Sequence, residues 1–162
     1  MNKFKDNAAT GTSFGILLAL SFSHLANDTL QSVISAVYPL LKESLALSFA
    51  QIGLITLVYQ ISASVFQPVV GFYLDKRPNP WFLPVGMTFT MTGLTTLAFA
   101  HTVTLTVVAV FLVGIGSSIL QPEASRLTSL ASGGKRGMAQ SLFQVGGNLG
   151  GSLGPLLVAL II

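Results

Sequence analysis

Long apolar runs separated by short charged segments organise this chain. Residues 52–70 and 81–120 contain no Asp, Glu, Lys or Arg, and the charged stretch 71–80 lies between them. About 20 apolar helical residues cross the ~30 Å hydrocarbon core of a bilayer. The pattern therefore predicts a chain that crosses a membrane several times, with 71–80 as a loop in water. Five spans are predicted, at about residues 13–40, 49–74, 80–100, 104–130 and 138–162.

Prolines and polar residues set the expected ends of these spans. Pro39 should end the first helix, because its ring removes a backbone donor and clashes with the preceding turn, and residues 42–48 should form an aqueous loop. Pro122 should kink or unwind the fourth span. Residues 1–13 are polar and small, which favours a flexible cytoplasmic tail ahead of the membrane region at 14–162.

The composition favours an all-α integral membrane protein. Of the 162 residues, 51% are hydrophobic and 8% are charged, against about 25% charged residues in an average soluble domain. The mean hydropathy of +0.74 agrees with a lipid environment. The net charge of +3 is scattered without a basic stripe, so no nucleic-acid partner is expected. The chain lacks cysteine, and His24 lies far from His101, so neither a metal nor another cofactor is expected, nor an enzyme.

The distribution of Lys and Arg predicts the orientation. One side of the predicted topology holds Lys3, Lys5, Lys76, Arg77, Lys135 and Arg136, and the other side holds Lys42. Cytoplasmic loops carry the excess of Lys and Arg, so we expect a multi-pass protein of the cell inner membrane with a cytoplasmic amino terminus. The chain stops on bare apolar residues. We therefore expect a truncated product, or the amino-terminal piece of a protein whose carboxy-terminal half is missing.

An acid near the middle of the first span is the most informative single residue. Asp28 shares one helical face with other polar residues at helical spacing, which are His24, Asn27, Gln31 and Ser35. An acid at this depth costs about 2.5–3.5 kcal/mol on insertion scales, and such residues commonly mark ion or substrate paths. One interpretation is a proton carrier in a transport cavity, with His24 sharing its proton. The other is a structural polar contact between helices.

Side-chain amides on other spans extend this polar pattern. They are Gln60 on the second span, Gln121 on the fourth, and Gln144 and Asn148 on the fifth, with Gln67 and Gln140 close by. Polar faces on several helices favour a shared cavity for a polar ligand. Hydrogen bonds between helices are the alternative, and they average only about 0.6 kcal/mol each.

The fifth span carries small residues at G-x-x-x-G spacing. Gly146, Gly150 and Gly154 recur every fourth residue and are followed by Pro155. This spacing is typical of close helix packing in membranes. The residues that follow lack the Gly-Lys-Ser/Thr of a phosphate-binding loop, so nucleotide binding is not expected.

Charged residues near the cytoplasmic ends of the second and fourth spans form a candidate gate. The fourth span places Glu123 and Arg126 at i, i+3 spacing, which permits an ion pair. The second span ends at the same predicted depth with Gly71, Asp75, Lys76 and Arg77. We call these six residues the gate cluster. A charge network here would hold the inner face closed, and anchoring of the basic residues by lipid headgroups is the alternative.

These residues resemble a known family. Gly71, Asp75, Lys76 and Arg77 resemble the first half of the loop motif of the major facilitator superfamily, and the glycines that end at Pro155 resemble its antiporter motif. Longer strings are similar to its fosmidomycin resistance branch, at residues 23–28, 67–71, 75–81, 121–126 and 139–148. The arginine that the family usually carries on the fourth span is replaced by Val110. Asp28, with His24, is then the preferred proton carrier.

The resemblance implies a proton-coupled exporter of about twelve spans, of which this chain holds the first five. Its cargo would be fosmidomycin or a related small anionic or polar molecule, exchanged for protons by alternating access. The residues expected to line the cavity are Asp28, His24, Asn27, Gln31, Gln60, Gln121, Gln144 and Asn148. Two alternatives remain open at this stage. They are a five-span membrane subunit or remnant without transport activity, and a metabolite importer of the same superfamily.

Overall fold

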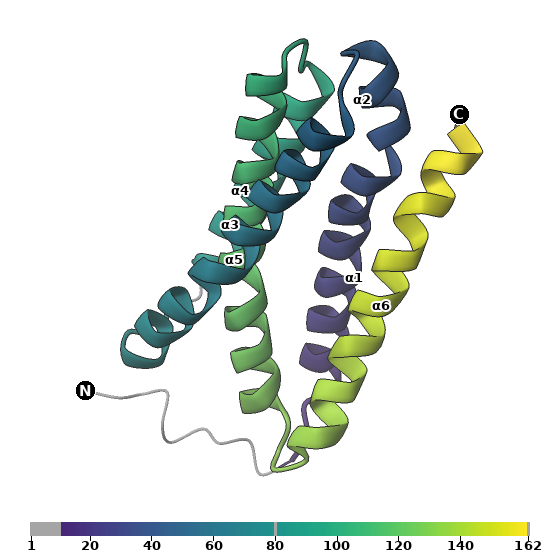
Figure 1. The fold of residues 1–162 in the computed structure, drawn as a ribbon. Coiled ribbons are helices and arrows are strands. Elements are labelled where there is room, and N and C mark those ends of the chain that lie inside the picture. Colours follow the sequence, from purple (N-terminus) through teal and green to yellow (C-terminus); the bar gives the residue numbers. More distant parts are fainter. Residues whose placement is uncertain (1–10, 80, 162) are drawn as a thin grey trace.

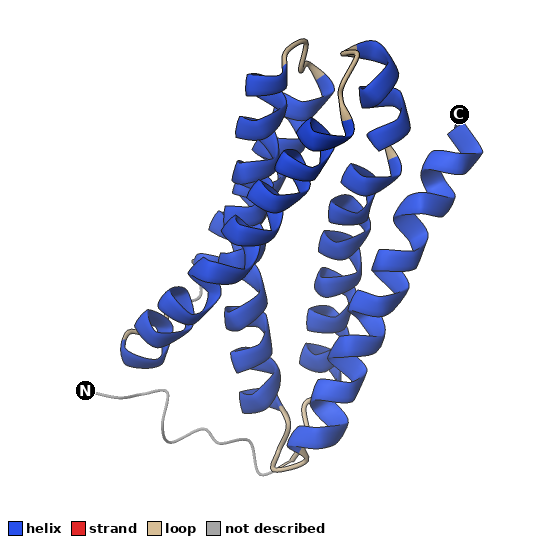
Figure 2. Cartoon of the chain, viewed as in Figure 1, coloured by secondary structure: helices blue, strands red, loops and turns tan. Residues whose placement is uncertain are grey.

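The computed structural model describes residues 11–79 and 81–161, and this part of the chain consists of helices joined by short loops (Figures 1 and 2). No β-strand occurs among these residues, so the all-α prediction is confirmed. Most of the predicted tail, residues 1–10, lies outside the described part. The helices are α1 (Phe14–Ala36), α2 (Tyr38–Ser44), α3 (Phe49–Lys76), α4 (Phe82–Ala98), α5 (Val103–Ala131) and α6 (Arg136–Ile161).

Three of these helices, α3, α5 and α6, are long and apolar enough to cross a membrane by length and composition. The fourth, α4, is apolar but has 17 residues. Helix α1 has 23 residues but does not meet the hydropathy criterion. The predicted count of five spans is therefore not confirmed by these criteria, although the lengths are compatible with it.

The prediction for the end of the first span is wrong. Helix α1 ends at Ala36, and a separate short helix, α2, then carries Pro39 in its first turn and Lys42 near its end. Proline fits the first turn of a helix, where its missing N–H would have no partner. Pro39 therefore begins a helix instead of ending one, and the predicted loop at 42–48 shortens to residues 45–48.

The prediction that 71–80 is a loop is also wrong in its first half. Helix α3 continues through Gly71 and Asp75 to Lys76, and Arg77 leaves the helix with φ −134° and ψ 74°. Pro78 is the nearest residue that opposes the helix, because proline disfavours helical geometry in the residue before it. The apolar run ended earlier, but loss of apolar character does not itself end a helix.

Proline inside a helix is tolerated in this chain. Pro122 lies within the continuous helix α5, as Pro68 does in α3 and Pro155 does in α6. The fourth span therefore does not unwind at Pro122, and the alternative, a kink at this position, stays a prediction. In membrane helices, neighbouring groups and small backbone adjustments satisfy the carbonyl that proline leaves free.

The helices form two closely packed groups. Helix α6 runs alongside α1, while α5 packs against both α3 and α4 (Figure 1). Fewer contacts join the groups, mainly between α1 and α5 and between α5 and α6. A buried apolar cluster near the α2 end includes Ile34, Ile55 and Val110. A charged side chain at Val110, which is fully buried, would therefore lie among apolar neighbours.

Glycine permits the close approach of helices in both groups. A Cβ atom at Gly116 of α5 would lie 2.7 Å from the backbone nitrogen of Thr90 in α4. A Cβ atom at Gly150 of α6 would overlap the carbonyl oxygen of Leu25 in α1. Large apolar side chains instead face outward, including Phe22, Phe72 and Leu160. This arrangement is typical of helices that pack in lipid, where small residues lie at the contacts between helices.

Candidate functional site

His24 and Asp28 are in direct contact on the face of α1 that turns into the bundle. Their atoms Nε2 and Oδ2 are 3.2 Å apart, and the side chain of His24 is 5% exposed while that of Asp28 is 23% exposed. The His24 ring also stacks on Phe143 of α6, with the ring centroids 4.1 Å apart. On the other side of the ring, Nδ1 lies 3.0 Å from the carbonyl oxygen of Phe143.

These contacts determine which atoms of the pair can hold a proton. A carbonyl oxygen only accepts hydrogen bonds, so Nδ1 of His24 must carry a hydrogen. A neutral imidazole has only one N–H, and Nε2 would then present a lone pair to the carboxylate of Asp28. The 3.2 Å contact between Nε2 and Oδ2 becomes an ion pair when the imidazole gains a second proton. We call His24 and Asp28 the proton pair.

Asn27 holds the second oxygen of Asp28 and joins α1 to α4. Its Nδ2 donates to Oδ1 of Asp28 at 3.2 Å, and its own Oδ1 accepts from Thr90 at 3.4 Å. Both Asn27 and Thr90 are fully buried. Asn27 therefore contacts Asp28 of the proton pair, but it does not line the cavity described in the next paragraph.

A cavity of about 290 Å³ opens beside Asp28, between the two groups of helices. We call it the polar cavity. Its volume is near the lower end of the ~300–1,000 Å³ range of ligand pockets. Most of its lining side chains are polar, and they come from α1, α2 and α3, with Gly151 of α6 closing one side. The polar ones are Asp28, Gln31, Ser32, Ser35, Tyr38, Thr56, Tyr59 and Gln60.

Gln31 and Tyr59 connect the two groups of helices across the polar cavity. The Tyr59 hydroxyl donates to Oε1 of Gln31 at 2.5 Å. A second contact runs parallel to it, between the Thr56 and Tyr38 hydroxyls at 3.0 Å. The side-chain nitrogen of Gln31 is buried and has no hydrogen-bond partner among the described residues.

The structure brings together only some of the residues that the sequence predicted for a cavity. Asp28, Gln31 and Gln60 line the polar cavity, and His24 lies directly behind Asp28. The other predicted amides lie elsewhere. Gln144 and Asn148 are exposed on α6, Gln121 is half-buried on α5, and none of them lines this cavity. Gln140 bonds to Ser125 and Ser129, joining α6 to α5.

Sequence reasoning missed the hydroxyl side of the cavity. Tyr59 and Thr56 lie on α3 beside Gln60, at i, i+3 and i+4 spacing, which places all three on one helical face. That spacing was available as a signal, because tyrosine and threonine carry polar groups on apolar bodies. The carbonyl of Phe143 gave no signal, since every residue has one.

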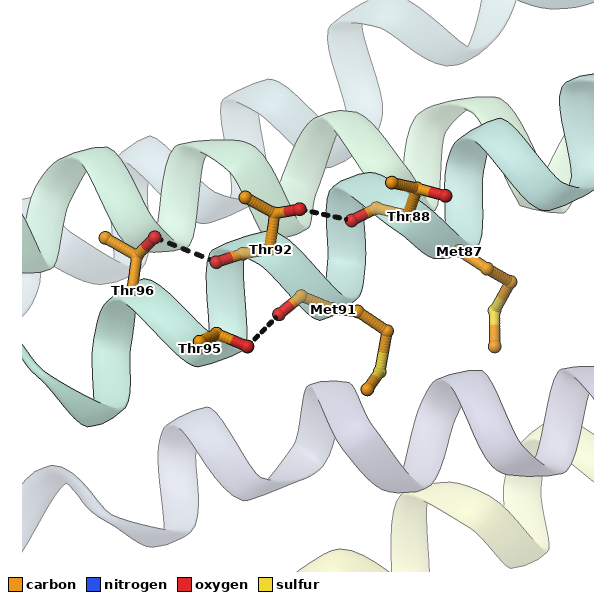
Figure 3. Close-up of a pocket in the computed structure, with 6 residues that line it drawn as sticks. All are labelled: Met87, Thr88, Met91, Thr92, Thr95 and Thr96. Atoms are coloured by element: carbon orange, nitrogen blue, oxygen red, sulfur yellow. Dashed lines mark hydrogen bonds between the residues drawn. The ribbon is translucent and has the colours of Figure 1, made fainter.

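Two larger hollows carry less chemistry. One of about 450 Å³ follows α4, where the hydroxyls of Thr92, Thr95 and Thr96 donate to carbonyls of their own helix while Met87 and Met91 extend toward α1 (Figure 3). The other, of about 720 Å³, lies mainly among aliphatic side chains of α1, α2 and α4. Neither contains a buried polar group without a partner among the described residues. The polar cavity is therefore the candidate site.

A second charged site lies near the end of α5. Glu123 is fully buried and binds Arg126 through two hydrogen bonds, of 2.8 and 2.6 Å. The side chain of Arg126 is 20% exposed. Bidentate contacts of this kind are the strongest hydrogen bonds between charged side chains.

The rest of the gate cluster does not bond to this pair. Asp75, Lys76 and Arg77 are exposed and make no ion pair among the described residues. The Asp75 carboxylate lies within electrostatic range of Arg126, and the Lys76 ammonium lies over the Phe72 ring at 4.0 Å. A Cβ atom at Gly71 would lie 3.8 Å from Pro122, an ordinary contact, so close packing does not require glycine there.

The glycines of α6 bring its backbone against α1 beside the proton pair. A Cβ atom at Gly147 would lie 2.6 Å from Nε2 of His24, and one at Gly154 would lie 2.7 Å from the Thr29 carbonyl oxygen. Gly146 faces Ser21, whose hydroxyl donates to the Leu142 carbonyl at 2.8 Å. Pro155 follows within α6. The packed contact between α1 and α6 therefore holds the Phe143 carbonyl against His24.

Comparison with known proteins identifies the family. The profile of the Major Facilitator Superfamily matches residues 20–162. The chain belongs to the Major Facilitator Superfamily. It is 58% identical over 151 residues to the fosmidomycin resistance protein of Escherichia coli (strain K12), a match that covers 93% of this chain and 37% of the relative. The proteins of this family are membrane transporters, and the chain has several long apolar helices. The chain is therefore a multi-pass membrane protein.

Further relatives cover the same part of the chain. An uncharacterized MFS-type transporter of Bacillus subtilis (strain 168), YfnC, is 48% identical over 93% of this chain and 37% of its own length. A probable sulfoacetate transporter of Cupriavidus necator is 30% identical over 80% of this chain and 30% of its own length. The chain thus spans about a third of the length of these curated relatives. No solved structure gives a significant match.

Proposed function

We propose that this chain is part of a proton-coupled exporter of small anionic or polar molecules such as fosmidomycin. The observation that carries the proposal is the proton pair, in which His24 and Asp28 lie 3.2 Å apart inside an apolar bundle beside the polar cavity. Ionisable groups at such positions are costly and commonly serve ion or substrate movement. The likeness to a fosmidomycin resistance protein supports the choice of cargo.

In this proposal the chain provides five spans of an amino-terminal half. Helices α1, α3, α4, α5 and α6 cross the membrane, and α2 caps α1 at the outer surface. The excess of Lys and Arg in the tail and in the loops after α3 and α5 puts the amino terminus in the cytoplasm, in the cell inner membrane of a bacterium. The greater length of the relatives supports a carboxy-terminal half that faces the polar cavity.

The mechanism follows from this placement. Two helical halves rock about a central site, so that the cavity opens to one side of the membrane at a time. Cargo enters from the cytoplasm, and a proton that enters from outside on Asp28 or His24 drives the return. Cargo and proton can drive the change between the two open states only if each binds one state more tightly than the other, and they must favour different states.

Transport by the complete gene product tests the proposal. Purified protein in vesicles should move fosmidomycin against its gradient when protons flow the opposite way, and the movement should stop when the pH gradient is collapsed. Movement in the same direction as the protons would favour the importer. If folded protein in the vesicles moves no fosmidomycin in either direction, the result would favour a subunit without transport activity.

We further propose that the gate cluster closes the cytoplasmic side. Asp75 on α3 would pair with Arg126 on α5 through a local shift of these two helices in the closed state, because Arg126 retains exposed surface while Glu123 is buried. Replacing Asp75 with asparagine should slow fosmidomycin transport about twofold to fivefold, as expected for an exposed charge contact of up to ~1 kcal/mol that acts in one state. Expression should be unchanged.

The matched control for this prediction is Asp6→Asn, the same change in the tail. Vesicle transport and membrane expression should both stay at the wild-type level in the control. A normal transport rate for Asp75→Asn would leave headgroup anchoring as the role of Lys76 and Arg77.

A further inference from the structure

Gln31 contains the one buried side-chain nitrogen or oxygen without a hydrogen-bond partner in the described part of the chain. The residue is 8% exposed and lines the polar cavity. Its Oε1 is occupied by the Tyr59 hydroxyl, so both hydrogens on Nε2 remain available. A buried donor without an acceptor is unfavourable, and native structures rarely retain one without a reason.

The remaining donors of the cavity are largely satisfied within the protein. The Ser32 hydroxyl donates to the Thr29 carbonyl oxygen, and the Ser35 hydroxyl donates to the Ser32 carbonyl oxygen. The Thr56 hydroxyl lies 2.9 Å from the carbonyl of Ile52. Gln31 is therefore the donor that this part of the cavity offers to a ligand from a buried position.

The charges around the cavity limit which part of a ligand can accept from Gln31. Neither Lys nor Arg lines the polar cavity, and the one charged group that does is Asp28. With a second proton on the imidazole the pair of Asp28 and His24 is neutral overall, and without that proton it is negative. An anionic group placed here would find no cation and would meet a carboxylate, which is unfavourable at low dielectric constant.

We propose that Gln31 binds an uncharged acceptor oxygen of the cargo, such as an amide, hydroxamate or ketone carbonyl. The anionic group of the same cargo then lies away from Asp28, outside the part of the site that this chain forms. This inference rests on the proposed transport function and adds a specificity determinant to it. Gln31 distinguishes cargo with a neutral oxygen from cargo of equal charge that lacks one.

Two phosphonates of equal charge test this assignment. Fosmidomycin is a propylphosphonate with an uncharged N-formyl hydroxylamine group at its far end, and plain propylphosphonate lacks that group. Binding of both is measured on the purified complete gene product. The wild-type protein should bind fosmidomycin about tenfold more tightly than propylphosphonate, the effect of satisfying one buried donor.

Two substitutions at Gln31 remove the donor in different ways. Gln31→Met preserves the length of the side chain without polar hydrogens, and Gln31→Glu keeps an acceptor for Tyr59. Both should reduce the preference for fosmidomycin to about twofold or less.

The matched control is Tyr59→Phe, which breaks the bond between α1 and α3 but keeps the amide nitrogen. It should retain the tenfold preference. Loss of the preference in Tyr59→Phe as well would mean that Gln31 acts through the contact between helices, and would overturn the assignment. Equal wild-type binding of the two phosphonates would overturn it while leaving the exporter proposal intact. No wild-type binding of either compound would overturn both.

Discussion

Replacing Asp28 with asparagine is expected to abolish proton-driven transport. The asparagine side chain can still bond to Asn27, but it has no carboxylate that could take up or release a proton beside Nε2 of His24. Fosmidomycin movement driven by a pH gradient should therefore fall at least about tenfold, to the rate measured without a gradient. The measurement is vesicle transport by the complete gene product, with and without the gradient.

The same variant should still exchange cargo when no gradient is applied. Exchange needs the cavity and the rocking motion but does not need net proton movement. A protein damaged in its fold would lose both activities, so the exchange rate separates the two explanations. Glu43→Gln, the same chemical change on the exposed surface of α2, is the control and should behave as the wild type. Undiminished pH-driven transport in Asp28→Asn would refute the assignment of the proton pair.

A methyl group at Gly150 should destabilise the protein markedly. Its Cβ atom would overlap the Leu25 carbonyl oxygen and lie 3.0 Å from the Leu25 Cα atom. Both are backbone atoms of α1, so the helices must move apart. Overpacking of this kind costs about 1–3 kcal/mol. Gly150→Ala should therefore lower the thermal unfolding midpoint of the purified complete gene product, and should loosen the contact between Phe143 and His24.

The neighbouring glycine is the matched control. A Cβ atom at Gly151 meets nothing within 4 Å. Alanine has the higher helix propensity by up to ~1 kcal/mol, so Gly151→Ala should leave the midpoint unchanged or raise it. Equal midpoints for the two alanine variants would show that α6 can shift away from α1 at little cost.

Helical content and the approximate limits of the helices were predictable from the sequence, since apolar runs of this length leave few other solutions in lipid. The errors lay at the ends. Pro39 begins α2, and α3 continues through Asp75 to Lys76. Hydropathy reports where side chains prefer to lie, whereas a helix ends where backbone hydrogen bonding stops. The two positions differ by several residues wherever a helix extends beyond the bilayer.

The sequence by itself determined the class of protein, the polar face of α1 and the small-residue face of α6, because helical spacing decides which residues share a face. Only the tertiary structure decided which faces meet. It placed Gln31 against Tyr59 and His24 against the Phe143 carbonyl, and it left Gln144 and Asn148 exposed. Spacing within one helix carries no information on the rotation of its neighbours. The hydrogen bond of His24 Nδ1 is made to a backbone oxygen of α6. Every residue has such an oxygen, so the sequence could not indicate this contact.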